Sequence, residues 1–129
     1  MVVAAKRKKR KQERDMHELG VVFYVVKDVK QVAVENNVEK IASVTLQIGE
    51  VSGIIHEYLI DCWNWAKKKE AVMEEAELVI EQIDAVSFCE DCKKEYPTVQ
   101  YAKVCPHCGS ENTYLVQGNE FLIKEIGVY

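Results

Sequence analysis

The apolar positions along the chain first recur with the spacing of an amphipathic helix. Between residues 19 and 33 they fall at Leu19, Val22, Phe23, Val26, Val29 and Ala33. A second stripe of the same kind runs through residues 55–66, at Ile55, Leu59, Cys62, Trp63 and Ala66. Because this spacing gathers apolar side chains on one side of a helix, we predict two helices that each bury one face.

Alternating and β-rich runs predict strands around these helices. In residues 40–51 the apolar positions Ala42, Val44, Leu46 and Ile48 alternate with polar ones, which indicates a strand with one buried side. Residues 76–85 predict a second strand. Residues 113–129 hold two β-rich runs around Gly118-Asn119, a pair typical of a tight hairpin. We expect the later run, residues 120–128, to return to the sheet of the first two strands.

Composition and charge narrow the class of protein. The 129 residues are 48% hydrophobic and 29% charged, which is typical of a globular chain rather than a disordered or membrane-spanning one. Residues 1–15 carry a net charge of +5, whereas residues 16–129 carry −9. An acidic domain argues against a nucleic-acid footprint on the folded surface. The basic run has no apolar stretch after it, so it is not a secretory signal, and we expect a cytoplasmic protein.

Four of the five cysteines are paired by their spacing. CEDC at residues 89–92 and CPHC at residues 105–108 give the pattern C-x2-C-x12-C-x2-C. Each pair can turn two thiolates towards one ion, and two pairs supply the closed four-sulfur shell that suits structural Zn(II). An iron site with the same ligands has the same spacing. Because such a shell leaves no open position on the metal, we expect it to hold this segment together rather than to catalyse a reaction.

The order of these features predicts an α+β fold. Two helices would pack on a small three-stranded sheet, with an inserted zinc-ribbon-like subdomain between the second and third strands. The expected division is a disordered basic extension at residues 1–15, an α+β domain at residues 16–86 plus 118–129, and the zinc-binding subdomain at residues 87–117.

The remaining cysteine and two of the three histidines have plain structural interpretations. Cys62 lies on the apolar stripe of the second predicted helix and is expected to be a core thiol. His107, inside the second cysteine pair, is expected to be an exposed loop residue, and its alternative role is an auxiliary metal ligand. His56 and Glu57 open the second helix, where a solvated first turn competes with a donor pair.

Residues 15–18, Asp15-Met16-His17-Glu18, precede the first predicted helix and allow two interpretations. In the first, Asp15 is the N-cap and Glu18 reaches back to it in a capping box, which leaves His17 exposed. In the second, Met16 is the true start of the protein. Its amine, deprotonated backbone amides and the His17 imidazole then form the planar nitrogen set that Ni(II) or Cu(II) prefers. Residues 1–15 remove the free amine and leave His17 and Glu18 as side-chain candidates.

Taken together, the Met-His-Glu triplet, the α+β domain and the four-cysteine insert resemble the HypA family, the nickel-insertion accessory proteins of NiFe-hydrogenase maturation. The resemblance runs from residue 16 to about residue 128. It is carried by MHELGVV at the start, LQIGEVSGIIHEYLIDCWNW in the centre, CEDC and CPHC in the insert, and QGNEFLIKEIGV near the end.

This resemblance implies a nickel metallochaperone, without catalytic turnover. Family members hold Ni(II) at an N-terminal Met-His-Glu, so the nickel role passes to His17 and Glu18, with Met16 supplying backbone groups. The implied structural Zn(II) ligands are Cys89, Cys92, Cys105 and Cys108. The implied partners are the GTPase HypB, the hydrogenase large-subunit precursor and, in some members, urease accessory proteins. We expect a monomer or weak homodimer with no nucleic-acid or membrane partner.

Two other classes of function remain open from the residues alone. A zinc ribbon that binds nucleic acid or another protein would use the basic extension together with the cysteine pairs, and salt-dependent retention on DNA or RNA would reveal it. A thiol oxidoreductase would need an accessible cysteine with a low pKa.

Overall fold

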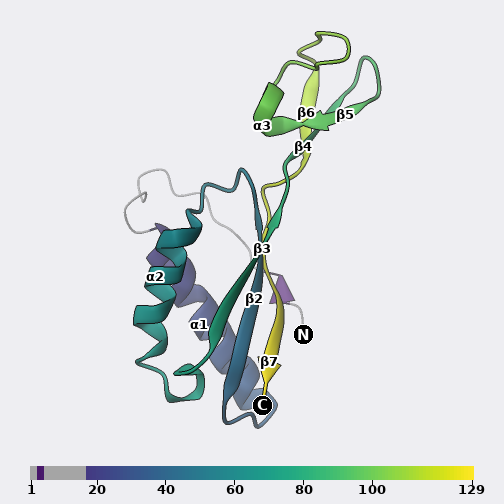
Figure 1. The fold of residues 1–129 in the computed structure, drawn as a ribbon. Coiled ribbons are helices and arrows are strands. Elements are labelled where there is room, and N and C mark those ends of the chain that lie inside the picture. The colour runs from purple at the N-terminus through teal and green to yellow at the C-terminus, as the bar shows by residue number, and fades with distance from the viewer. Residues whose placement is uncertain (1–2, 5–16) are drawn as a thin grey trace. The chain divides into compact units, whose positions relative to one another are not determined.

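The computed structural model describes residues 3–4 and 17–129. Two helices lie beside a four-stranded sheet, as can be followed in Figure 1. Helices α1 (His17–Glu35) and α2 (His56–Lys67) cover one face of this sheet. The strands are β1 (Val3–Ala4), β2 (Ile41–Gly49), β3 (Glu77–Ile83) and β7 (Phe121–Val128), in the order β1-β7-β2-β3. A short 3-10 helix, Ala71–Met73, lies between α2 and β3.

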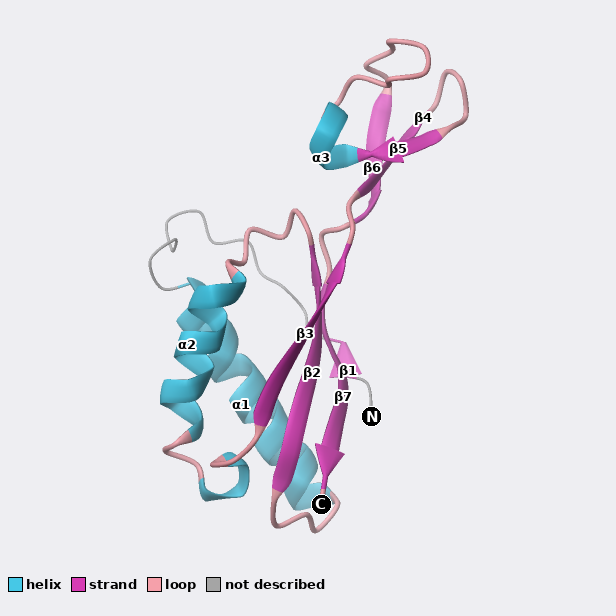
Figure 2. Ribbon diagram, in the orientation of Figure 1, coloured by secondary structure: helices cyan, strands magenta, loops and turns pink. Residues whose placement is uncertain are grey.

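A second, three-stranded sheet lies in the cysteine-rich insert (Figure 2). Its strands are β4 (Val86–Cys89), β5 (Glu95–Pro97) and β6 (Thr113–Gln117), in the order β5-β4-β6. Both neighbours of β4 run antiparallel to it. The one-turn helix α3 (Thr98–Tyr101) follows β5 directly. The α+β fold expected from the sequence, with a small metal-binding insert, is therefore confirmed.

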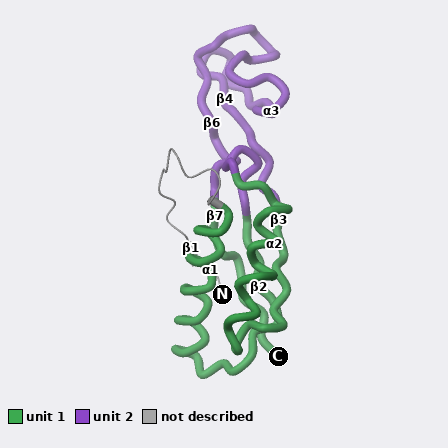
Figure 3. Tube along the Cα trace, turned by 90° about the vertical axis from the view of Figure 1, so that its left-hand side faces the viewer, with its two compact units in different colours: residues 1–47, 54–81, 121–129 green, residues 48–53, 82–120 purple. Residues whose placement is uncertain are grey.

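The chain divides into two compact units (Figure 3). The first, which we call the α+β unit, contains residues 1–47, 54–81 and 121–129. The second, the cysteine unit, contains residues 48–53 and 82–120. Its limits are wider than the insert predicted at residues 87–117, because residues 49–51 form hydrogen bonds with residues 83, 85, 118 and 120 on either side of that insert. The disorder predicted for residues 1–15 stays a prediction, since only Val3–Ala4 of that segment are described.

The core of the α+β unit is built from the inner faces of α1, β2 and α2. Helix α1 contributes a row of buried valines and an alanine, Val22, Val25, Val26, Val29 and Ala33. Strand β2 contributes Ile41, Val44 and Leu46, and α2 contributes Leu59, Trp63 and Ala66. The indole Nε1 of Trp63 donates a hydrogen bond to the carbonyl oxygen of Ala76, 3.0 Å away, so this large side chain is buried with its polar group satisfied.

Four positions of the predicted helix stripes differ from the structure, and one of them, Leu19, is only partly buried. Phe23 is 49% exposed, and its ring packs against Trp65 of α2, 6.3 Å between centroids, while Val25 takes the buried position. Ile55 is 48% exposed, and Cys62 is only partly buried. In residues 21–26 of α1 every side chain is aliphatic or aromatic, so the spacing alone does not fix which of them faces the sheet.

The predicted hairpin at Gly118-Asn119 is wrong, because the two flanking strands belong to different sheets. Strand β6 pairs with β4, whereas β7 lies between β1 and β2 as the returning strand that the sequence predicted. Gly118 has a φ of +117°, and a β-carbon there would collide with the backbone of Ala85. A β-carbon on Gly49 would likewise collide with Gly118. These glycines therefore serve a close approach of backbones rather than a two-residue turn.

The sheet of the α+β unit contains the three predicted strands and one more. The three-stranded sheet predicted for the α+β unit corresponds to β7, β2 and β3, and the two-residue β1 adds a fourth strand at the edge. Among the described residues no helix is long and apolar enough to cross a membrane.

Candidate metal centre

The two cysteine pairs sit on turns that repeat the same backbone hydrogen bonds. In the first turn, Lys93 N–H donates to Cys89 O at 2.8 Å, and Cys89 N–H donates to Lys94 O at 2.9 Å. In the second turn, Gly109 N–H donates to Cys105 O at 2.8 Å, and Cys105 N–H donates to Ser110 O at 2.9 Å. The sequence C-x2-C thus folds twice into one knuckle geometry.

The residue after each knuckle has a left-handed backbone. Gly109 has a φ of +76° and Lys93 a φ of +61°. Glycine adopts this conformation without steric cost, whereas it is energetically unfavourable for lysine, which has a β-carbon. Lys93 is held there by the same pair of hydrogen bonds that closes the turn, so the knuckle geometry is imposed by the local fold in both halves.

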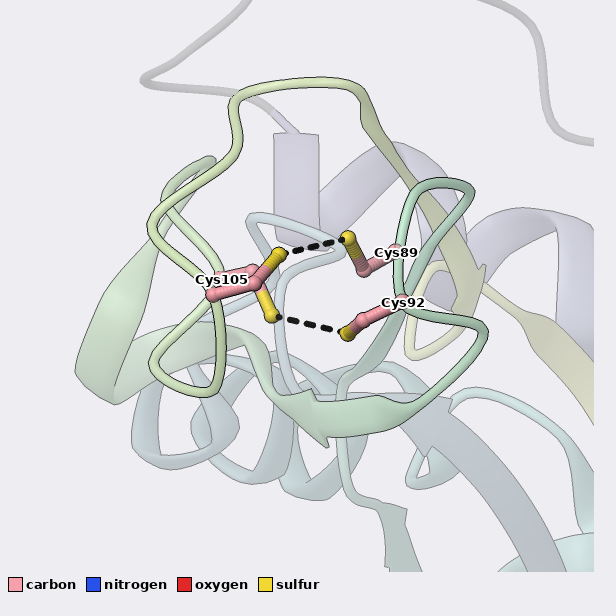
Figure 4. Close-up of side chains that lie close together, drawn as sticks. Cys89, Cys92 and Cys105 are labelled. Atoms are coloured by element: carbon pink, nitrogen blue, oxygen red, sulfur yellow. Dashed lines mark hydrogen bonds between the residues drawn. The ribbon is translucent and has the colours of Figure 1, made fainter.

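The four sulfur atoms converge on one point (Figure 4). All four lie within 4.8 Å of one another, and the pairs Cys89–Cys108 and Cys92–Cys105 are each 3.6 Å apart. A tetrahedral zinc with Zn–S bonds of about 2.3 Å separates its sulfurs by about 3.8 Å. A disulfide would require about 2.05 Å, and none of the five cysteines forms one. The spacing of these sulfurs fits a metal shell.

The backbone around the sulfurs favours one thiolate in advance of metal binding. Hydrogen bonds from the backbone amides of Cys92 and Asp91 lower the pKa of the Cys89 thiol to about 7, against the opposing effect of burial. Burial, together with the neighbouring thiols of Cys105 and Cys89, raises the pKa of Cys92 to about 12. Four thiolates this close repel one another, so the fully ionised cluster needs a bound cation.

A small core and a polar network support the knuckles. Tyr96 is 2% exposed and packs with the buried Cys89 and Cys105, and its hydroxyl donates to Ala102 O at 2.8 Å. The Ser110 hydroxyl donates to the Asp91 carboxylate, and this hydrogen bond is the main reason that the pKa of Asp91 lies below its ordinary value. The second cysteine turn is thereby tied to the first by side chains as well as by sulfur.

His107 lies beside the cluster, with its side chain in solvent. Its backbone N–H donates to the Cys105 sulfur at 3.3 Å, and its ring Nε2 lies 3.4 Å from Glu95 O. The exposure expected for this residue is confirmed. The group of converging metal-binding side chains contains the four cysteines and not His107. Its auxiliary role stays a prediction.

The Met-His-Glu triplet falls at the edge of the described chain. Met16 and Asp15 lie outside the described residues, so the predicted capping box is not tested, and His17 is described only as the first residue of α1. Glu18 is 5% exposed, and its Oε2 accepts a hydrogen bond from Ile55 N–H at 2.9 Å. A contact across 37 positions has no signal in the sequence, and sequence reasoning missed it.

The other candidate donors lie on the first turn of α2. His56 is partly buried and Glu57 is exposed. Neither belongs to a converging group of three or more metal-binding side chains among the described residues. Cys62, one and a half turns further along α2, has a raised pKa because of burial first and then the nearby charges of Glu18 and Asp61. A thiol with a raised pKa is a poor nucleophile at neutral pH.

Comparison with known proteins places almost the whole chain in one family. A family model described as "Hydrogenase/urease nickel incorporation, metallochaperone, hypA" matches residues 16–128. The hydrogenase maturation factor HypA of Chlorobium phaeobacteroides (strain BS1) is 33% identical over 113 residues, which cover 88% of this chain and 99% of that protein. The hydrogenase maturation factor HybF of Klebsiella pneumoniae is 28% identical over 111 residues, 86% of this chain and 97% of that protein.

Solved structures agree with the sequence matches. The solution structure of the Ni metallochaperone HypA from Helicobacter pylori superposes with a TM-score of 0.63 at 26% identity, covering 86% of this chain and 96% of that one. A second solution structure, of a HypA protein, gives a TM-score of 0.67 at 27% identity and covers 88% and 97% of the two chains.

Proposed function

This chain belongs to the HypA family of nickel-incorporation metallochaperones, and we propose that it binds Ni(II) at Met16, His17 and Glu18 and delivers it during hydrogenase maturation. The observation that carries the proposal is where the family match begins. It starts at Met16, so the Met-His-Glu triplet opens the matched region and leads directly into α1.

The start of a helix is chemically suited to this triplet. The first four backbone N–H groups of an α-helix have no acceptor within the helix. Because α1 begins at His17, the amide nitrogens of His17 and Glu18 can be deprotonated and coordinate a metal without breaking a helical hydrogen bond. The positive end of the helix dipole also favours the resulting amide anions. Together with the His17 imidazole they form a nitrogen-rich set of the kind that Ni(II) prefers.

We further propose that the cysteine cluster holds structural Zn(II) rather than the transported nickel. Four thiolates form a closed tetrahedral shell, which suits zinc and leaves no position for exchange with a recipient. Since α3 and the short strands of the cysteine unit enclose only a small core, metal binding would contribute much of its folding free energy. The protein would then carry one metal for structure and another as cargo, with no catalytic turnover.

The proposed delivery is ligand exchange with partner proteins. The recipient would be the large-subunit precursor of a NiFe-hydrogenase, with a HypB-type GTPase cooperating and, in a urease-containing cell, the urease accessory proteins as further partners. The five cysteines form no disulfide, as is usual in a reducing compartment, which supports a cytoplasmic location. The net charge of −9 on residues 16–129 supports protein rather than nucleic-acid partners.

The test is a nickel titration by calorimetry on three zinc-loaded proteins. We expect His17→Ala to abolish nickel binding and to leave zinc content and far-UV circular dichroism unchanged. The matched control is His56→Ala, which also removes a histidine from the first residue of a helix, and it should bind nickel like the wild type. Unchanged nickel affinity in His17→Ala would refute the proposed site.

A further inference from the structure

Glu18 is the one residue of the proposed nickel triplet whose side chain is described, and its surroundings are unusual for a metal ligand. It is 5% exposed, although it is a charged residue in the first turn of α1. Its Oε2 accepts a hydrogen bond from Ile55 N–H at 2.9 Å. A charged carboxylate is rarely buried unless it is paired or hydrogen-bonded, so this contact accounts for its burial.

The acceptor role of Glu18 completes the N-terminus of α2. Ile55 is the N-cap residue of α2, and no side chain of its own segment caps the helix. The first backbone N–H groups of a helix need an external acceptor, and the helix dipole favours a negative charge beside them. Glu18, which belongs to α1, supplies both the hydrogen-bond acceptor and the negative charge. Withdrawing it to a metal would leave the Ile55 N–H without this partner.

We infer that Glu18 is a positioning residue of the nickel site rather than a carboxylate ligand: its side chain caps α2 and thereby holds the first turn of α1, with His17, in place. The inference rests on the proposed function. Nickel that is to be transferred must exchange its ligands with a recipient. The carboxylate of a residue that is only 5% exposed and that already accepts a hydrogen bond from Ile55 N–H is poorly placed for such exchange. The backbone amide of Glu18 stays available to nickel in either case.

The pKa of Cys62 on α2 also responds to the charge of Glu18. The carboxylate of Glu18 is close enough to Cys62 to help raise the pKa of that thiol, after the larger effect of burial. The aromatic pair Phe23–Trp65 holds the two helices together further along, so the Glu18–Ile55 hydrogen bond fixes the end that the pair does not reach.

A glutamine at position 18 separates the two roles. Its amide oxygen can accept the hydrogen bond from Ile55 N–H, but it cannot act as an anionic metal ligand. We expect Glu18→Gln to bind nickel within about threefold of the wild type and to keep the same visible absorption bands. Glu18→Ala should bind nickel at least tenfold more weakly, about 1.4 kcal/mol, and the Ile55 amide should exchange hydrogen faster in NMR experiments.

Two controls keep the test informative. Glu57→Ala removes an exposed carboxylate from the first turn of α2 and should leave nickel affinity unchanged. His17→Ala reports on the proposed function itself. If His17→Ala abolishes binding but Glu18→Gln is as weak as Glu18→Ala, the carboxylate is a ligand and only the present inference is overturned. Wild-type affinity in Glu18→Ala would overturn it as well. If His17→Ala binds nickel normally, the proposed function fails instead.

Discussion

Trp63 is the side chain of α2 whose removal should destabilise the α+β unit most. It is 1% exposed, and its Nε1 donates to Ala76 O at 3.0 Å. Truncating a buried tryptophan to alanine costs about 3–5 kcal/mol, because transfer free energy is lost and a cavity remains. The Ala76 carbonyl also accepts a hydrogen bond from Lys67 Nζ at 3.1 Å, so it keeps a partner and adds little to this cost.

Trp65 is the matched control for this prediction, two residues along the same helix. It is 52% exposed and contacts Phe23 and the Lys69 ammonium, which lies 4.5 Å from its ring centroid. Aromatic and cation–π contacts at such exposed sites contribute about 0.5–1 kcal/mol each. Trp65→Ala should therefore cost about 1–2 kcal/mol. Urea unfolding of the zinc-loaded variants, followed by circular dichroism at 222 nm, measures both values, and equal costs would refute the packing described for α2.

Two further predictions concern the metal cluster and pH. Cys105→Ser should lower zinc content well below one ion per chain, whereas Cys62→Ser should leave it unchanged, because Cys62 is not part of the four-cysteine group. Atomic absorption measures the zinc content of both variants. Equal zinc content in the two variants would contradict the assignment of the zinc ligands. Hydrogen bonds from Lys124, and then from Gln47, lower the pKa of Glu81 from its ordinary value of 4.5, so its stabilising contribution is present above about pH 4.5 and is lost as the pH falls through the lowered pKa. The difference in unfolding free energy between wild type and Glu81→Gln should accordingly be largest near neutral pH and vanish in strong acid; a difference that grows on acidification would show the opposite sign.

Much of the fold was accessible from the sequence because its signals are local. The helical spacing of residues 19–33 and 55–66 located α1 and α2, and the alternation of residues 40–51 located β2. The orientation of α1 was less accessible, because Val25 and Phe23 are equally apolar and only the packing of the finished unit turns Phe23 outward.

The glycine at position 118 shows how one local signal can have two structural meanings. Gly118-Asn119 between β-rich runs is typical of a hairpin. The same glycine is also required where two backbones approach closely, and here the approach of Ala85 decides. Nothing in the neighbouring residues separates these cases, because the partner segment lies more than thirty positions away in the chain.

One of the two candidate sites was predictable from the sequence and the other was not. The cysteine knuckles follow from spacing alone, since two residues between cysteines suffice to define each turn, and the structure brings all four sulfurs together as expected. The environment of Glu18 could not be predicted. The sequence predicted its carboxylate as half of a capping box at α1, and that pairing stays a prediction because Asp15 lies outside the described residues. What the sequence did not indicate is that one carboxylate oxygen accepts the hydrogen bond from Ile55 N–H at the start of α2.

X-ray absorption at the nickel and zinc edges of one doubly loaded sample tests whether the two metals occupy separate sites. We expect nitrogen and oxygen neighbours around nickel, including the imidazole of His17, and four sulfur neighbours at about 2.3 Å around zinc. Sulfur scattering at the nickel edge would contradict it, because nickel would then occupy the cysteine cluster and the Met-His-Glu triplet would not be its site.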